Sequence, residues 1–106
     1  MSVIEVDKID AMGISKDGKG LILMLVDHLD WDDEGSNLLV LQDKINAYLG
    51  FIESNQFLDT YPDVKFEYFV IDVHFKFKIT ENCVKFINVI NKQLEINKIK
   101  VVENIN

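Results

Sequence analysis

Acidic side chains are concentrated in one short segment of this 106-residue chain. Five carboxylates fall within eight residues, at Asp27, Asp30, Asp32, Asp33 and Glu34. Hard cations such as Ca²⁺ and Mg²⁺ prefer such oxygens, but the spacing lacks the turn glycine and the closing glutamate of an EF-hand loop. Two other interpretations stay open: a solvated loop that caps the following helix, and a docking loop for a basic partner.

Trp31 lies among these acids, which is unusual for a loop that only contacts solvent. It either folds back onto the core and holds the loop in place, or it is an exposed anchor, since tryptophan is enriched at interface hot spots. In the second case the loop is the binding site. The partner-binding residues predicted on that basis are Asp30, Trp31, Asp32, Asp33 and Glu34.

The histidines His28 and His74 are the next candidates for chemistry, with Asp72 on the same strand face as His74. They would approach each other if their strands are neighbours. A zinc site needs three protein ligands, and a nucleophilic site needs an oriented base, but no spacing here specifies either. The sequence therefore predicts no catalytic residue, no metal ligand and no cofactor.

Cys83 follows Thr80 at the expected start of a helix, where the helix dipole can lower the pKa of a thiol. It also belongs to the apolar stripe of that helix, and free cysteine commonly behaves as a small buried hydrophobe. The stripe favours a buried Cys83 over a nucleophilic one. An enzyme is therefore not the favoured class of function.

The elements that position these residues follow from hydrophobic periodicity and turn signals. Asp17-Gly18 between two apolar runs predicts a hairpin, and Thr80 is the expected cap of the second helix. The expected elements are a strand over Lys8–Ser15, a strand over Leu21–Asp27, a helix with its apolar stripe from Leu38 to Ile52, a strand alternating from Phe69 to Ile79, a helix from Glu81 to about Asn97, and an edge strand over Ile99–Ile105.

The predicted fold class is α+β, in one domain over residues 1–106. Its order is β-β-α-β-α, with a final β if the tail pairs. We expect a small, mostly antiparallel sheet with both helices packed on one face. The helix stripes and the face carrying Phe69, Ile71, Val73, Phe75, Phe77 and Ile79 would form the core.

Charge restricts the expected partners. The net charge is −7, with 13 acids and 4 lysines in residues 1–63 but 5 acids and 7 lysines in residues 64–106, and there is no arginine. This balance argues against nucleic-acid binding. The acids either keep the protein soluble or attract a basic protein as a partner.

Location is predicted from apolar runs and cysteine count. The longest apolar run, Leu21–Val26, is far shorter than the ~20 residues of a membrane span, so we expect no membrane partner. The first six residues lack the basic start and apolar core of a signal peptide. With a single cysteine, which cannot form an intramolecular disulfide framework, the expected location is the cytoplasm.

Three segments carry a distinctive pattern: Asp27-His28-Leu29-Asp30-Trp31, then Leu41-Gln42-Asp43-Lys44-Ile45-Asn46-Ala47-Tyr48-Leu49-Gly50-Phe51-Ile52-Glu53-Ser54, then Tyr61-Pro62-Asp63. The pattern resembles a family of small bacterial proteins of unknown function. The resemblance covers about the middle third of the chain and implies a bacterial cytoplasmic setting. It implies no activity, substrate or cofactor.

Two functions are expected from these residues. The first is a protein-binding module, comparable to an immunity protein or an adaptor, that uses the acidic Trp31 loop. The alternative is a metal-dependent or small-molecule-binding domain that uses His28, His74 and nearby carboxylates. A homodimer through Leu21–Val26, with Tyr68 and Val70, is a further expectation.

Overall fold

A computed structural model of the chain describes residues 9, 11–29 and 31–105. Four strands and two α-helices account for most of the regular structure. In chain order the elements are β1 (Ala11–Ile14), β2 (Gly20–Asp27), α1 (Glu34–Glu53), the 3₁₀ helix η2 (Gln56–Asp59), β3 (Tyr68–Phe75), α2 (Glu81–Leu94), the 3₁₀ helix η3 (Glu95–Asn97) and β4 (Ile99–Ile105). The α+β class and the strand at the tail are confirmed.

The strands form one mixed sheet in the order β1-β2-β3-β4. β1 pairs with β2 antiparallel, whereas β2 with β3 and β3 with β4 are parallel. The expectation of a mostly antiparallel sheet was therefore wrong in detail. A helical crossover carries the chain back to the end of the sheet at which the preceding strand began, so the strands joined by each β-α-β segment run parallel. Only the hairpin is short enough to reverse the strand direction.

The predicted hairpin joins β1 to β2. Ser15 N donates to Gly20 O at 2.9 Å and Gly18 N donates to Ser15 O at 3.0 Å. Gly18 has a φ of +74°, a conformation that glycine adopts without steric cost. The Asp17-Gly18 signal in the sequence is thus a real turn.

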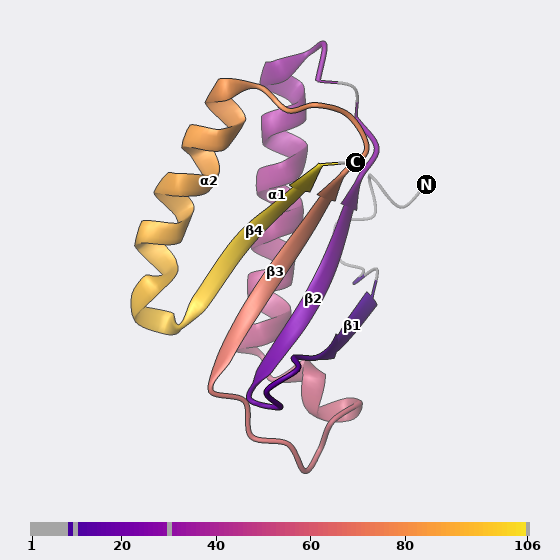
Figure 1. Cartoon of the computed structure of the whole chain (residues 1–106), viewed down its shortest axis with the longest axis vertical. Helices are drawn as coiled ribbons and strands as arrows, with labels where there is room; N and C mark the ends of the chain where they lie inside the picture. Colours follow the sequence, from indigo (N-terminus) through magenta and orange to yellow (C-terminus); the bar gives the residue numbers. More distant parts are fainter. Residues whose placement is uncertain (1–8, 10, 30, 106) are drawn as a thin grey trace.

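One face of the sheet is covered by helices and the other is open (Figure 1). On the covered face, Leu21, Leu23 and Leu25 of β2 are fully buried, with alternate residues of β3 and β4 beside them. The stripes of both helices complete the same core cluster, since Leu41, Ile45 and Tyr48 of α1 and Cys83 and Ile87 of α2 belong to it. Figure 1 shows α1 behind the sheet and α2 alongside β4. Both helices packing on one face was the prediction, and it is confirmed.

β3 is shorter than its alternating pattern predicted. The strand ends at Phe75, and Phe77 is 43% exposed, although the sequence placed it on the buried face. The reason is loss of partners: β2 ends at Asp27, and the register of β4 ends where Ile105 pairs with Phe75. After one further hydrogen bond, from Lys76 N to Asp27 O at 2.9 Å, the chain bends away from the sheet.

Candidate functional site

The carboxyl ends of β2 and β3 meet the amino ends of α1 and α2 at one end of the domain, the upper end in Figure 1. Two connections cross this end, residues 28–33 between β2 and α1 and residues 76–80 between β3 and α2. Carboxyl ends of parallel strands are where α/β proteins often place their ligand sites. We call this region the strand-exit end.

Trp31 is part of the core. Its side chain is 5% exposed, and its ring meets that of Phe75 edge-on, with centroids 6.0 Å apart. Its φ of +66° is uncommon for a bulky residue. With the Asn37 amide oriented by its hydrogen bonds, the Asn37 oxygen accepts from Trp31 N at 3.0 Å. Trp31 therefore holds the acidic loop against the sheet, which was one of its two predicted roles, and its side chain is not on the surface.

Of the other predicted binding residues, three lie at the amino end of α1: Asp32, Asp33 and Glu34. Asp32 and Asp33 are exposed, and Asp33 caps the helix by accepting from Ser36 N at 3.4 Å. Asp30 lies outside the described residues. Acids here stabilise the positive end of the helix dipole, so part of the acidic pattern is explained by capping.

Glu34 joins the two helix starts. Its Oε1 accepts from Asn82 Nδ2 at 3.0 Å. Hydrogen bonds from Thr80 and then Asn82 lower the pKa of this carboxyl below its usual value. Thr80 in turn caps α2 by accepting from Cys83 N at 3.2 Å. The loops before α1 and α2 are therefore held together.

Phe77 and Glu81 belong to the strand-exit end but were missed as site residues from sequence. Phe77 lies on the short connection before α2, and Glu81 is exposed in the first turn of that helix. The same connection carries the exposed Lys76 and Lys78, and Lys76 Nζ lies 5.6 Å from the centroid of the Phe77 ring. The alternating pattern from Phe69 to Ile79 gave no sign that Phe77 is exposed. Its exposure follows from the lengths of the partner strands, because β3 can continue only as far as β2 and β4 extend beside it.

Beneath this surface lies a small group of buried polar atoms. Asp27 is 4% exposed, and its Oδ1 accepts from Leu29 N at 2.8 Å. Asp27 Oδ2 and Trp31 Nε1 are buried, and neither has a partner at full hydrogen-bonding geometry among the described residues, although the indole is near enough to the carboxyl to lower its pKa. Burial raises the pKa of Asp27, against smaller opposing effects from Leu29 N–H, the Trp31 indole and the Lys44 ammonium.

The two histidines are not part of this buried group. His28 is exposed just beyond β2, while His74 pairs with Val26 in the register and lies on the open face. There His74 Nε2 is 3.1 Å from Asp72 Oδ2, and Asn104 Nδ2 donates to Asp72 Oδ1. This makes a linear network of three side chains on the open face.

Metal and thiol chemistry find little support in this arrangement. No group of three or more His, Cys, Asp and Glu side chains within the described part of the chain could hold a metal ion. Cys83 is fully buried, and desolvation, followed by the charges of Glu103, Asp27 and Glu34, raises the pKa of its thiol to about 12. The buried interpretation of Cys83 is confirmed.

The helices are also too short or too polar for a bilayer: none in the described ranges has the length and apolarity that crossing a membrane requires. Comparison with known families gives one match, to the model described as "Family of unknown function (DUF6572)", over residues 1–106. Searches among curated proteins and among solved structures gave no match.

Proposed function

The chain belongs to DUF6572, a family of unknown function, and from this premise we propose that it is a protein-binding module whose partner presents a basic surface. The family match agrees with the resemblance seen in the sequence, which also led to a family without an assigned activity. The observation that carries the proposal is the exposed ring of Phe77 at the strand-exit end, the end that also carries the exposed Asp32, Asp33 and Glu81.

Phe77 has the properties of an interface anchor. The 43% exposed ring lies on a connection between a strand and a helix and does not belong to the core cluster. Aromatic side chains are enriched in the centres of protein interfaces. Burying the exposed part of the ring against a partner would be favourable at roughly 25 cal/mol per Å² of apolar surface. Because Trp31 is buried, Phe77 takes the place that Trp31 had in the sequence-based hypothesis.

The charges around Phe77 favour a basic partner. Asp32, Asp33 and Glu81 are exposed at this end, Glu34 is half-buried, and Lys76 and Lys78 offset them only in part. Rim charges act mainly on the association rate and on the choice of partner. With a net charge of −7 and no arginine, the same surface repels nucleic acid.

The strand-exit end is also held in one conformation. Trp31 fixes the first connection against Phe75, and the Glu34–Asn82 hydrogen bond of 3.0 Å joins it to the start of α2. A surface that is already ordered loses less conformational entropy on binding. The buried Trp31 thus supports the proposal as a scaffold residue.

The test is site-specific photocrosslinking in a lysate of the encoding organism. A photoreactive phenylalanine analogue replaces Phe77, and the matched control carries it at Ile96, which is 87% exposed in η3 at the other end of the domain. We expect a basic protein to be captured from position 77 and not from position 96. Capture should fall about tenfold at high salt, because exposed charges are screened.

Charge variants complete the design. Asp32→Asn with Glu81→Gln should weaken capture at position 77, whereas Asp43→Asn with Glu53→Gln, which change the net charge equally on the exposed face of α1, should not. Equal capture from both crosslinker positions, or equal effects of both charge pairs, would refute the proposal.

The proposal also extends to the cellular location of the protein and to the kind of role it has there. An immunity-like or adaptor-like role in the bacterial cytoplasm suits a small acidic chain whose one cysteine is free and buried. Inside cells, cysteine side chains are usually reduced and form no disulfide. Fractionation of cells with an antibody against the protein would test the location directly.

A further inference from the structure

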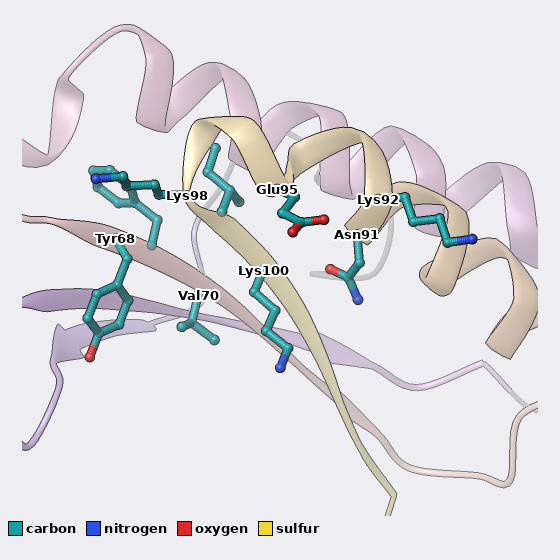
Figure 2. Close-up of a pocket in the computed structure, with 9 residues that line it drawn as sticks. Tyr68, Val70, Asn91, Lys92, Glu95, Lys98 and Lys100 are labelled. Carbon is teal, nitrogen blue, oxygen red and sulfur yellow. The ribbon is translucent and has the colours of Figure 1, made fainter.

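A second surface, at the opposite end of the domain, has a different chemistry. A groove of about 550 Å³ lies where β3 and β4 begin and α2 ends (Figure 2). Its volume is within the range of small-molecule sites, roughly 300–1,000 Å³. The groove shares no residue with the strand-exit end, so it is independent of the proposed function.

The walls of the groove are mainly apolar. Tyr68, Phe69, Val70 and Ile99 line it, and Figure 2 shows the side chains of Tyr68 and Val70 on the same side of β3. Apolar walls of this kind remove hydrocarbon from water, which is the main driving force for binding an apolar ligand body.

The polar groups at the groove are mostly cationic. Lys92, Lys98 and Lys100 line it, and Glu95 is the one acid among its lining residues. Three of the 11 lysines of a chain with net charge −7 therefore gather at one apolar site. Lys92 also offsets the negative end of the α2 dipole, being in its last turn, but Lys98 and Lys100 lie beyond that helix.

The backbone around the groove is fixed. Lys98 has a φ of +60°, its N–H donates to Glu95 O at 3.1 Å, and its carbonyl accepts from Phe69 N at 2.9 Å. The Asn91 amide joins α2 to β4 by accepting from Val101 N at 2.7 Å and donating to Val101 O at 2.9 Å. The walls are thus preformed, which reduces the ordering cost of binding.

We propose that this groove binds a small anionic amphiphile, an apolar chain that carries one carboxylate. The chain would lie along Tyr68 and Val70, which share one face of β3. The carboxylate would be held by Lys100, which pairs with Val70 in the register, while Lys92 and Lys98 add positive charge at the two ends of the groove. Charge complementarity chooses this ligand over a cationic or a purely apolar one, since only the anion offsets the three ammonium groups.

Titration of ¹⁵N-labelled protein followed by NMR tests the proposal, with decanoate as the probe below its micelle concentration. We expect saturable, one-to-one shifts of the amides of residues 68–70 and 91–100. Butyrate, which has the charge without the chain, and decyltrimethylammonium, which has the chain with the opposite charge, should produce no saturable shifts there. Saturable binding of either one with the affinity of decanoate would overturn the proposal, as would no saturable shift with decanoate.

Charge-matched variants add a second criterion. Lys92→Gln with Lys100→Gln should weaken decanoate binding about tenfold, since exposed ion pairs contribute little individually but add at one site. Lys65→Gln with Lys85→Gln changes two exposed lysines outside the groove and should leave the affinity within about twofold. An equal effect of both pairs would show nonspecific attraction and contradict the proposed site.

Discussion

The phenol ring of Tyr68 lies over Gly20, in the space that a Cβ on that glycine would fill. The two residues are also partners in the parallel register of β2 and β3. From there the Tyr68 hydroxyl reaches the hairpin turn, 3.0 Å from Ser15 Oγ and 2.9 Å from the Asp17 carboxylate. The hairpin is therefore joined to β3 through one side chain that requires glycine beneath it.

Replacing Gly20 with alanine should destabilise the protein by about 1–3 kcal/mol, as overpacking does, because the Tyr68 ring must move and lose its hydrogen bonds to the turn. The measurement is urea unfolding. Gly50→Ala is the matched control: its Cβ would meet no atom within 4 Å inside α1, so it should stabilise by about 0.5–1 kcal/mol. Equal changes in unfolding free energy for the two variants would show that the Tyr68 ring can move away from residue 20 without loss of stability.

Trp31 should report its own burial, because it is the one tryptophan of the chain. We expect blue-shifted emission and weak quenching by acrylamide in the native protein, both lost on unfolding. Trp31→Ala should cost about 3–5 kcal/mol, as for other large core residues, since it removes the contact with Phe75. Native emission like that of an exposed indole would contradict the core position.

The Cys83 thiol should be nearly inert in the folded protein. Burial and nearby carboxylates raise its pKa from 9.0 to about 12, so the thiolate fraction at pH 8 falls about a thousandfold. Reaction with a disulfide reagent should be slower by at least this factor than in urea. Comparable rates in the two states would mean that the amino end of α2 opens freely.

The stability contribution of Asp27 should fall as pH rises. Burial raises its folded pKa above 3.8, with Leu29 N–H, Trp31, Lys44 and His28 opposing. A folded state that binds the proton more tightly is favoured at low pH, and this advantage is lost between 3.8 and the raised value. Asp17 and Glu34 shift in the opposite direction, so the effect must be isolated by comparison.

Asp27→Asn provides that comparison, because asparagine keeps an oxygen for Leu29 N–H and does not titrate. The stability of the variant relative to the parent should increase as the pH rises from 3.8 through the raised pKa of Asp27. If the difference in unfolding free energy between variant and parent does not change with pH, burial does not disfavour the charged form of Asp27.

The sequence predicted those features that depend on local patterns. Thr80 is the predicted cap of α2, and Asp33, in the loop that was expected to cap the first helix, is the cap of α1, because short oxygen-bearing side chains at those positions satisfy free N–H groups. The direction and the length of the strands were harder to predict from the sequence. The end of β3 at Phe75 depends on where β2 and β4 end, which is not encoded near Phe77.

The candidate sites divide in the same way. The acidic cluster was visible as a run of residues, but the burial of Trp31 is a tertiary contact with Phe75. Phe77 and Glu81 join Asp32 and Asp33 only through the meeting of two helix starts. The groove at the other end combines lysines from α2, η3 and β4 with apolar residues of β3, and no spacing in the sequence announces it.

Asn91 should protect the free edge of β4. Its amide occupies both the N–H and the carbonyl of Val101, the groups through which an edge strand would pair with another chain. Asn91→Ala should cost about 1–3 kcal/mol, because both backbone groups lose their partner, and should increase self-association measured by sedimentation. Asn88→Ala, at an exposed position of the same helix, is the control and should change neither. If Asn91→Ala is as monomeric as the parent at high concentration, the edge of β4 is protected by its charged side chains and its short length, and Asn91 serves only to fasten α2.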